Sequence, residues 1–214
     1  MVKKKQPHIN TAAFYKFCSI IKPMKYQYSK SDTYTQKAKK ENYPARSVYK
    51  LQEINEKYGI IKAGDRVLDL GCAPGSWMMY LSKIVGFEGE VVGVDIEELK
   101  IEIPKNATFI EEDILNFEIA ENFNAVVSDM AGHTTGIDFS DVEETLELCW
   151  RAFQVAKNTL VKGGNFVCKV FEGEGIDDFY REVRKHFELA KRFKPKASRK
   201  QSREMYIVAT GFKK

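Results

Sequence analysis

The chain alternates between short apolar runs and amphipathic stretches over most of its length. The apolar runs predict seven strands, at Arg66–Leu70, Glu90–Ile96, Ala107–Glu111, Ala125–Met130, Asn165–Phe171, Leu189–Phe193 and Glu204–Gly211. Apolar positions repeated every three or four residues predict helices at Arg46–Tyr58, Ser76–Val85, Ser140–Leu160 and Ile176–Phe187. Strands that are apolar throughout and separated by helices indicate an α/β fold with a mostly parallel sheet covered on both faces. The last two strands follow each other through a loop, so we expect an antiparallel pair at one end of the sheet.

Two parts are expected along the chain. Residues 1–30 read as a basic N-terminal arm with a short helix near Thr11–Ile21, and residues 31–214 as one folded domain. A helix that carries Tyr34 and Ala38 opens the domain. A length of 214 residues suits one domain with a sizeable core.

A glycine-rich turn follows the first strand, in the segment Asp69-Leu-Gly71-Cys-Ala-Pro-Gly75-Ser-Trp77. Strand-to-helix turns are where doubly wound folds bind ligands, and glycine lets the backbone approach a ligand closely. The spacing between Gly71 and Gly75 is not the one that holds a dinucleotide pyrophosphate, so a nucleoside without phosphates fits better. A plain structural turn is the alternative.

Two acidic residues follow the next strands along the chain. Asp95 ends the second strand, where a carboxylate can accept both hydroxyls of an adenosine ribose. Asp113 follows the third strand and is expected to bind the adenine amino group. Acidic residues also end strands without any function, so each assignment depends on the glycine turn.

Isolated charges in apolar settings predict a second cluster. Lys169 interrupts the apolar run Phe166–Phe171, and burying an ammonium group is costly unless it is paired. Asp129 ends another apolar strand at the same edge of the sheet and is the expected partner. Lys50 follows Val48 and Tyr49 in a helix, and Glu204 begins the last strand. Structural salt bridges are the alternative for all four charges.

Charge is distributed unevenly. Residues 1–40 hold ten lysines and one acid, residues 191–203 hold seven basic residues and no acid, and residues 41–190 hold 15 basic and 28 acidic residues. Basic ends on an acidic body are typical of a surface that meets a phosphate backbone. The residues expected to contact the phosphate backbone of a nucleic acid are Lys37, Lys39, Lys40, Lys194, Lys196, Arg199, Lys200 and Arg203. For the first ten residues a solvated lysine-rich tail is the simpler interpretation.

Other classes of protein find little support. The four cysteines form no CxxC pair and the three histidines are scattered, so neither a disulfide framework nor a metal site is expected. No apolar run reaches the roughly 18 residues that suggest a membrane span. A cytoplasmic monomer is therefore expected, although the acid-free first 30 residues leave an organellar presequence open.

Five stretches then resemble the FtsJ/RrmJ family of RNA ribose methyltransferases, over roughly Asp32 to Phe212. They are Arg46-Ser-Val-Tyr-Lys50-Leu, the glycine turn, Val127-Ser-Asp129-Met-Ala, Val167-Cys-Lys169-Val-Phe-Glu-Gly-Glu-Gly175 and Ser202-Arg-Glu204-Met-Tyr-Ile-Val-Ala-Thr-Gly211. The resemblance implies a Rossmann-like class I methyltransferase domain that uses S-adenosylmethionine.

The resemblance also implies residue roles. The family's Lys-Asp-Lys-Glu catalytic tetrad matches Lys50, Asp129, Lys169 and Glu204. Its cofactor contacts match Gly75, Trp77, Asp95, Asp113 and Asp129, and the glycine turn adds Gly71 to this set. Lys169 is expected to accept the proton of the ribose hydroxyl or to orient that hydroxyl.

Within the family, both large-subunit rRNA and the tRNA anticodon loop are substrates. The chain length favours a uridine of large-subunit rRNA. The N-terminal arm and the pair Gly132-His133, where bacterial rRNA enzymes usually carry Pro-Asn, keep tRNA open. A small-molecule or protein methyltransferase would need neither the basic ends nor the tetrad, and a non-catalytic RNA-binding relative would lose the tetrad. The glycine spacing argues against a nicotinamide dehydrogenase.

Overall fold

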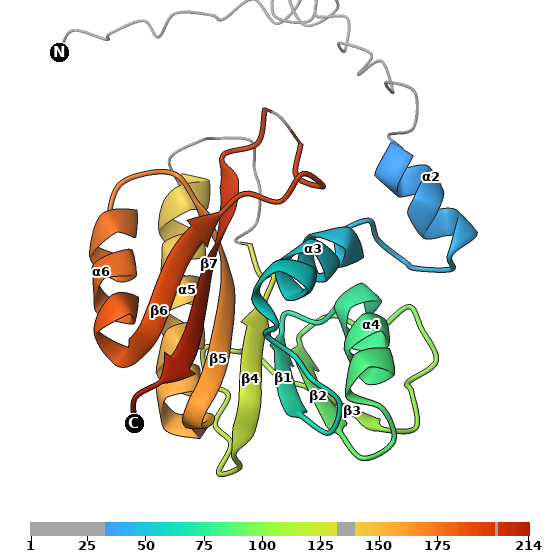
Figure 1. Cartoon of the computed structure of the whole chain (residues 1–214). Coiled ribbons are helices and arrows are strands. Elements are labelled where there is room, and N and C mark those ends of the chain that lie inside the picture. The colour runs from blue at the N-terminus through green and yellow to red at the C-terminus, as the bar shows by residue number, and fades with distance from the viewer. Residues whose placement is uncertain (1–32, 132–139, 200) are drawn as a thin grey trace, which may run out of the picture. The chain divides into compact units, whose positions relative to one another are not determined.

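Seven strands form one sheet in the order β3-β2-β1-β4-β5-β7-β6 (Figure 1). The computed structural model describes residues 33–131, 140–199 and 201–214. The strands are β1 Arg66–Leu70, β2 Glu90–Asp95, β3 Ala107–Glu111, β4 Phe123–Ser128, β5 Leu160–Phe171, β6 Phe187–Phe193 and β7 Glu204–Phe212. β1 to β5 run parallel, whereas β7 is antiparallel to both β5 and β6. The predicted mostly parallel sheet with an antiparallel pair at one end is confirmed.

Helices cover both faces of the sheet (Figure 1). α3 Val48–Tyr58 and α4 Ser76–Val85 cover one face, and α5 Ser140–Thr159 and α6 Ile176–His186 cover the other, whereas α2 Thr33–Lys40 packs against α3. The predicted arm and the predicted helix near Thr11–Ile21 lie outside the described residues.

Alternate residues of each strand enter two separate apolar cores. In β1, Leu68 and Leu70 join α5 and α6 in one core, whereas Val67 packs with α3 and α4 in the other. Successive side chains of a strand point to opposite faces. Once the face of one side chain is known, the side chains two residues before and after it are known to point to the same face. Asp69 therefore points to the α3/α4 face. This parity places the polar residues described below.

β5 begins earlier than the sequence indicated. The pair Gly163-Gly164 was expected to precede the strand, but it lies inside β5, which starts at Leu160. Phe123 pairs with Leu160 and Ala125 with Asn165, so residues 161–164 bulge out opposite a single residue of β4. Gly163 has φ of 81°, a left-handed conformation that glycine adopts without strain.

α3 starts at Val48 rather than at the expected Arg46. Its end matches the prediction, because Gly59 adopts φ 61° and donates its N–H to the carbonyl of Asn55 at 2.8 Å. A left-handed glycine of this kind closes a helix. The buried residues Val48, Leu51 and Ile54 hold α3 against the sheet.

Candidate active site

A row of polar side chains crosses the middle of the sheet on the α3/α4 face. Asp69 near the end of β1, Asp129 just after β4 and Lys169 in β5 share this face by strand parity. Tyr206 is the cross-strand partner of Lys169, and Glu204 lies two residues before it. Since β1, β4, β5 and β7 are successive neighbours, side chains far apart in sequence meet in the middle of the sheet, at the carboxyl ends of its parallel strands.

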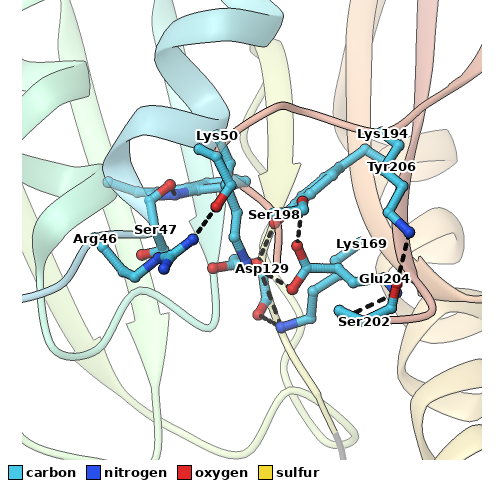
Figure 2. A network of polar contacts seen from close by, with 12 residues as sticks. Arg46, Ser47, Lys50, Asp129, Lys169, Lys194, Ser198, Ser202, Glu204 and Tyr206 are labelled. Atoms are coloured by element: carbon cyan, nitrogen blue, oxygen red, sulfur yellow. Dashed lines mark hydrogen bonds and ion pairs between the residues drawn. The ribbon is translucent and has the colours of Figure 1, made fainter. Parts of the chain in front are cut away.

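The four charged residues predicted from the sequence lie together as two ion pairs (Figure 2). Lys50 Nζ lies 2.6 Å from Glu204 Oε2, and both side chains are 12% exposed. Lys169 Nζ lies 3.3 Å from Asp129 Oδ1 and also donates to the main-chain carbonyl of Asp129. The Lys169 and Asp129 side chains are 9% and 16% exposed. Such pairs are shielded from solvent but still within reach of a ligand.

Tyr206 joins the two pairs and was not singled out by the sequence. Its hydroxyl donates to Asp129 Oδ1 at 2.6 Å, and Lys50 Nζ lies 5.9 Å from its ring centre. Burial, with the carboxylates of Asp129 and Glu204 nearby, raises the pKa of Tyr206, so the phenol stays protonated and keeps donating. The sequence could have indicated Tyr206, because residues two apart in a strand point to the same face and Tyr206 lies two residues after Glu204.

The turn between β1 and α4 has the backbone shape that its glycines predict. Gly71 has φ of 77° and Gly75 has φ of 107°. A Cβ on Gly71 would lie 2.3 Å from Met130 Cγ, and one on Gly75 would lie 2.6 Å from the side chain of Ile101. Glycine is required at both positions for space as well as for conformation.

Asp69 lies beneath this turn and is the most unusual carboxylate of the site. The residue is completely buried, and neither carboxyl oxygen has a hydrogen-bond partner among the described residues. Burial, with Asp129 and Asp95 nearby, raises the pKa of Asp69 well above its usual range. A buried acid without a partner is costly, and a cation or a hydrogen-bond donor placed beside it would relieve that cost.

The two acids expected to hold adenosine stand at the carboxyl ends of β2 and β3. Asp95 accepts the N–H of Ala73 at 2.8 Å and the N–H of Glu97 at 2.9 Å. These bonds tie Asp95 to the glycine turn and orient its carboxylate. Asp113 accepts the N–H of Leu115 at 3.0 Å. Contacts of either acid with adenosine stay a prediction.

Trp77 was expected to contact the cofactor, but its side chain is packed inside the protein. It is buried in the α3/α4 core, and its indole N–H donates to the carbonyl of Ser47 at 3.0 Å. Its ring centre lies 6.0 Å from that of Tyr206. Trp77 therefore fastens the starts of α3 and α4 to the centre of the site, and its role as a cofactor contact stays a prediction.

The side chains expected to contact RNA are exposed wherever the structure describes them, namely Lys37, Lys39, Lys40, Lys194, Lys196, Arg199 and Arg203. Lys200 and the pair Gly132-His133 lie outside the described residues. Arg46, which was not among the expected RNA contacts, lies against the loop between β6 and β7: its guanidinium donates to the carbonyl of Ala197. Burial and the nearby Arg199 lower the pKa of Arg46, and the nearby Glu204 opposes this change.

Two further kinds of feature are missing from the described part of the chain. Within it, no three His, Cys, Asp or Glu side chains gather as a metal site would require. None of the helices traced there is both long enough and apolar enough to cross a membrane.

Comparison with known proteins gives a consistent result. The model of the FtsJ-like methyltransferase family matches residues 43–212. A relative from Desulfatibacillum aliphaticivorans, named ribosomal RNA large subunit methyltransferase E, is 47% identical over 183 residues, which cover 83% of this chain and 88% of the relative. A protein of the same name from Desulforapulum autotrophicum is 44% identical, with 90% of this chain and 97% of the relative covered.

Among solved structures, a Plasmodium falciparum chain provisionally described as a ribosomal RNA methyltransferase matches with a TM-score of 0.70 at 24% identity. The match covers 79% of this chain and 98% of that one. At this identity the likeness shows the fold.

Proposed function

The chain belongs to the FtsJ-like methyltransferase family, and on that premise we propose that it methylates the 2′-hydroxyl of a ribose in large-subunit rRNA, with S-adenosylmethionine as methyl donor. The observation that carries the proposal is the meeting of Lys50–Glu204 and Lys169–Asp129 beside a glycine-lined turn. If these charges had only a structural role, one ion pair would suffice, and it would not need to lie next to a turn suited to a nucleoside.

The residues at the turn suit this methyl donor, which is a nucleoside with a cationic amino-acid tail and no phosphate. Gly71 and Gly75 let the side chains of Met130 and Ile101 lie directly against the turn, so these two side chains would flank a ligand bound there. The unpartnered Asp69 would stabilise a positive charge placed near it. Asp95 is oriented by two main-chain N–H groups and keeps lone pairs for ribose hydroxyls.

S-adenosylmethionine, when bound, supplies an activated methyl group on a sulfonium centre. The protein must then hold a ribose hydroxyl in line and remove its proton as the new oxygen–carbon bond forms. In the proposal Lys169 orients the hydroxyl and, when neutral, takes up its proton. Lys50 polarises the same oxygen, whereas Asp129 and Glu204 hold the two lysines in place.

The substrate follows from the relatives and from the surface charge. Two relatives that share more than 40% of their residues with this chain are named as large-subunit rRNA methyltransferases. The basic residues 194–203 lead directly into Glu204, so phosphate contacts made there would lie next to the tetrad. A monomer acting on ribosomal RNA in the cytoplasm is the proposed setting.

Removal of the Lys169 amine tests this assignment. Lys169→Ala should lower transfer of labelled methyl groups to large ribosomal subunits by at least about 1,000-fold, because both orientation and proton uptake are lost. Binding of S-adenosylmethionine, measured by calorimetry, should change little. Lys162→Ala, which removes an exposed lysine at the other end of β5, is the matched control. Turnover by Lys169→Ala close to that of the control would overturn the assignment.

A further inference from the structure

The loop between β6 and β7, described for residues 194–199 and 201–203, is hydrogen-bonded to α3 and to the segment just before it. The main-chain N–H of Lys196 donates to Glu53 Oε2 at 2.7 Å, and the Arg46 guanidinium donates to the carbonyl of Ala197. Within the loop, Lys194 Nζ donates to the carbonyl of Ser202 at 2.6 Å. These hydrogen bonds hold the loop, with its exposed cations, at points between its two ends as well as at the flanking strands.

Ser198 connects this loop to the tetrad (Figure 2). Its side chain is buried, and its hydroxyl donates to Glu204 Oε1 at 2.8 Å. The other carboxyl oxygen of Glu204, Oε2, receives Lys50 Nζ at 2.6 Å. The Glu204 carboxylate is therefore bridged, with the loop on one oxygen and the lysine on the other.

We propose that Ser198 is a positioning residue for methyl transfer, which fixes Glu204 and through it the ammonium group of Lys50. This inference rests on the proposed function. The side chains of Lys196 and Arg199, which flank Ser198 in the sequence, are exposed to solvent, so a phosphate group bound by either would lie close to the serine that holds Glu204.

The physical case lies in the freedom of the two side chains. Lys50 has a flexible four-carbon stem, and a carboxylate held at one oxygen can turn about its own axis. A hydroxyl that donates to a charged acceptor makes one of the stronger side-chain hydrogen bonds. Displacement of a catalytic group by about 1 Å can cost on the order of 100-fold in rate, so even partial loss of alignment is measurable.

Kinetics of large-subunit rRNA methylation test the inference. Ser198→Ala should lower kcat by about tenfold while KM for the RNA stays within about twofold, because the exposed cations remain. Ser198→Thr keeps the hydroxyl and should restore most of kcat. Ser198→Cys keeps the size but only a weak donor, and should behave like Ser198→Ala. Ser82→Ala is the matched control, since it also loses a side-chain hydrogen bond, 2.5 Å to Asn106 Oδ1, but on the far part of α4.

A double-mutant cycle separates positioning from a general loss of stability. If Ser198 acts through Glu204, Ser198→Ala should cost nothing further in a Glu204→Ala background. Thermal unfolding of each variant identifies any that fails to fold, and Ser198→Cys then replaces Ser198→Ala in the cycle. Full additivity of the two losses, or a wild-type kcat for both Ser198→Ala and Ser198→Cys, would overturn the inference and leave the proposed function intact. A wild-type chain that methylates no RNA would overturn both.

Discussion

At the scale of single residues, Asp69 is the least favourably placed acid in the site. Its carboxyl group is fully buried beside two other acids, and among the described residues nothing donates to either oxygen. Such a group favours its neutral form in the folded chain. In the proposed function, a cation bound beside Asp69 would favour the ionised form of this carboxyl group.

The raised pKa of Asp69 predicts how stability depends on pH without ligand. Below the usual aspartate pKa of about 3.9, the folded and unfolded chains both hold the proton, and stability is unaffected. Above that pH the unfolded chain releases the proton but the folded chain keeps it, so stability falls by up to about 1.4 kcal/mol per pH unit until the folded-state pKa is reached. Asp69→Asn removes this titration.

The free energy of unfolding of Asp69→Asn, relative to that of the wild type, should therefore rise as the pH increases from about 4 toward the folded-state pKa of Asp69. Urea titrations at several pH values measure it. Asp178→Asn, which changes a largely exposed acid on α6, is the control and should show no such trend. Parallel curves for Asp69→Asn and the wild type would show that Asp69 is ionised in the folded chain.

Individual residues differ in how far the sequence reveals them. A charge inside an apolar strand is conspicuous, so Lys169 and its pairing with Asp129 could be predicted. Lys50 and Glu204 were assigned through the family resemblance, and their contact depends on a helix and a strand that are 154 residues apart. Tyr206 and Ser198 are ordinary residues in their local sequence. Their importance follows from the folded structure, in which the Tyr206 hydroxyl donates to Asp129 and the Ser198 hydroxyl donates to Glu204.

At the scale of elements, the β1–α4 turn combines a left-handed backbone conformation with close packing against Met130 and Ile101. Gly75→Ala should lower the free energy of unfolding by about 1–3 kcal/mol, because its φ of 107° is strained for alanine. It should also weaken S-adenosylmethionine binding at least about tenfold, because the new Cβ meets Ile101 at 2.6 Å and shifts the wall of the turn.

Gly163→Ala is a matched control for this prediction. Gly163 also has a positive φ, of 81°, but nothing lies within 4 Å of a Cβ placed there. It should lose stability while binding the cofactor as the wild type does. Equal affinities for S-adenosylmethionine in the two variants would show that the turn does not hold this ligand. Calorimetry and thermal unfolding provide both measurements.

Element order and strand parity were predictable because burial imposes them. Strands such as Arg66–Leu70 and Ala107–Glu111 match the expected bounds, since apolar runs and flanking turns mark both ends. The start of β5 at Leu160 was missed, because a glycine pair normally signals a turn and here lies within a bulge. The position of β7 between β5 and β6 could not be predicted, because the local sequence does not determine which strands become neighbours.

At the scale of the whole molecule, the separation of charge predicts how RNA binding responds to salt. Lys196→Ala combined with Arg199→Ala should weaken binding to large-subunit rRNA and reduce the slope of log affinity against log salt by about 0.7–0.9 for each phosphate that the variant no longer neutralises. The double variant Lys105→Ala and Lys162→Ala removes two exposed lysines at the amino ends of β3 and β5. It removes the same amount of charge and should keep the wild-type slope; filter binding at several salt concentrations compares the two.

The chemical position of the transferred methyl group tests the proposed function most directly. Large ribosomal subunits and tRNA that lack the modification are incubated with the purified chain and isotopically labelled S-adenosylmethionine, and digested RNA is mapped by mass spectrometry. We predict one label, on the 2′-oxygen of a uridine in large-subunit rRNA, which disappears with Lys169→Ala. Label on a base, on tRNA or on ribosomal protein, or label that persists in Lys169→Ala, would contradict the proposal.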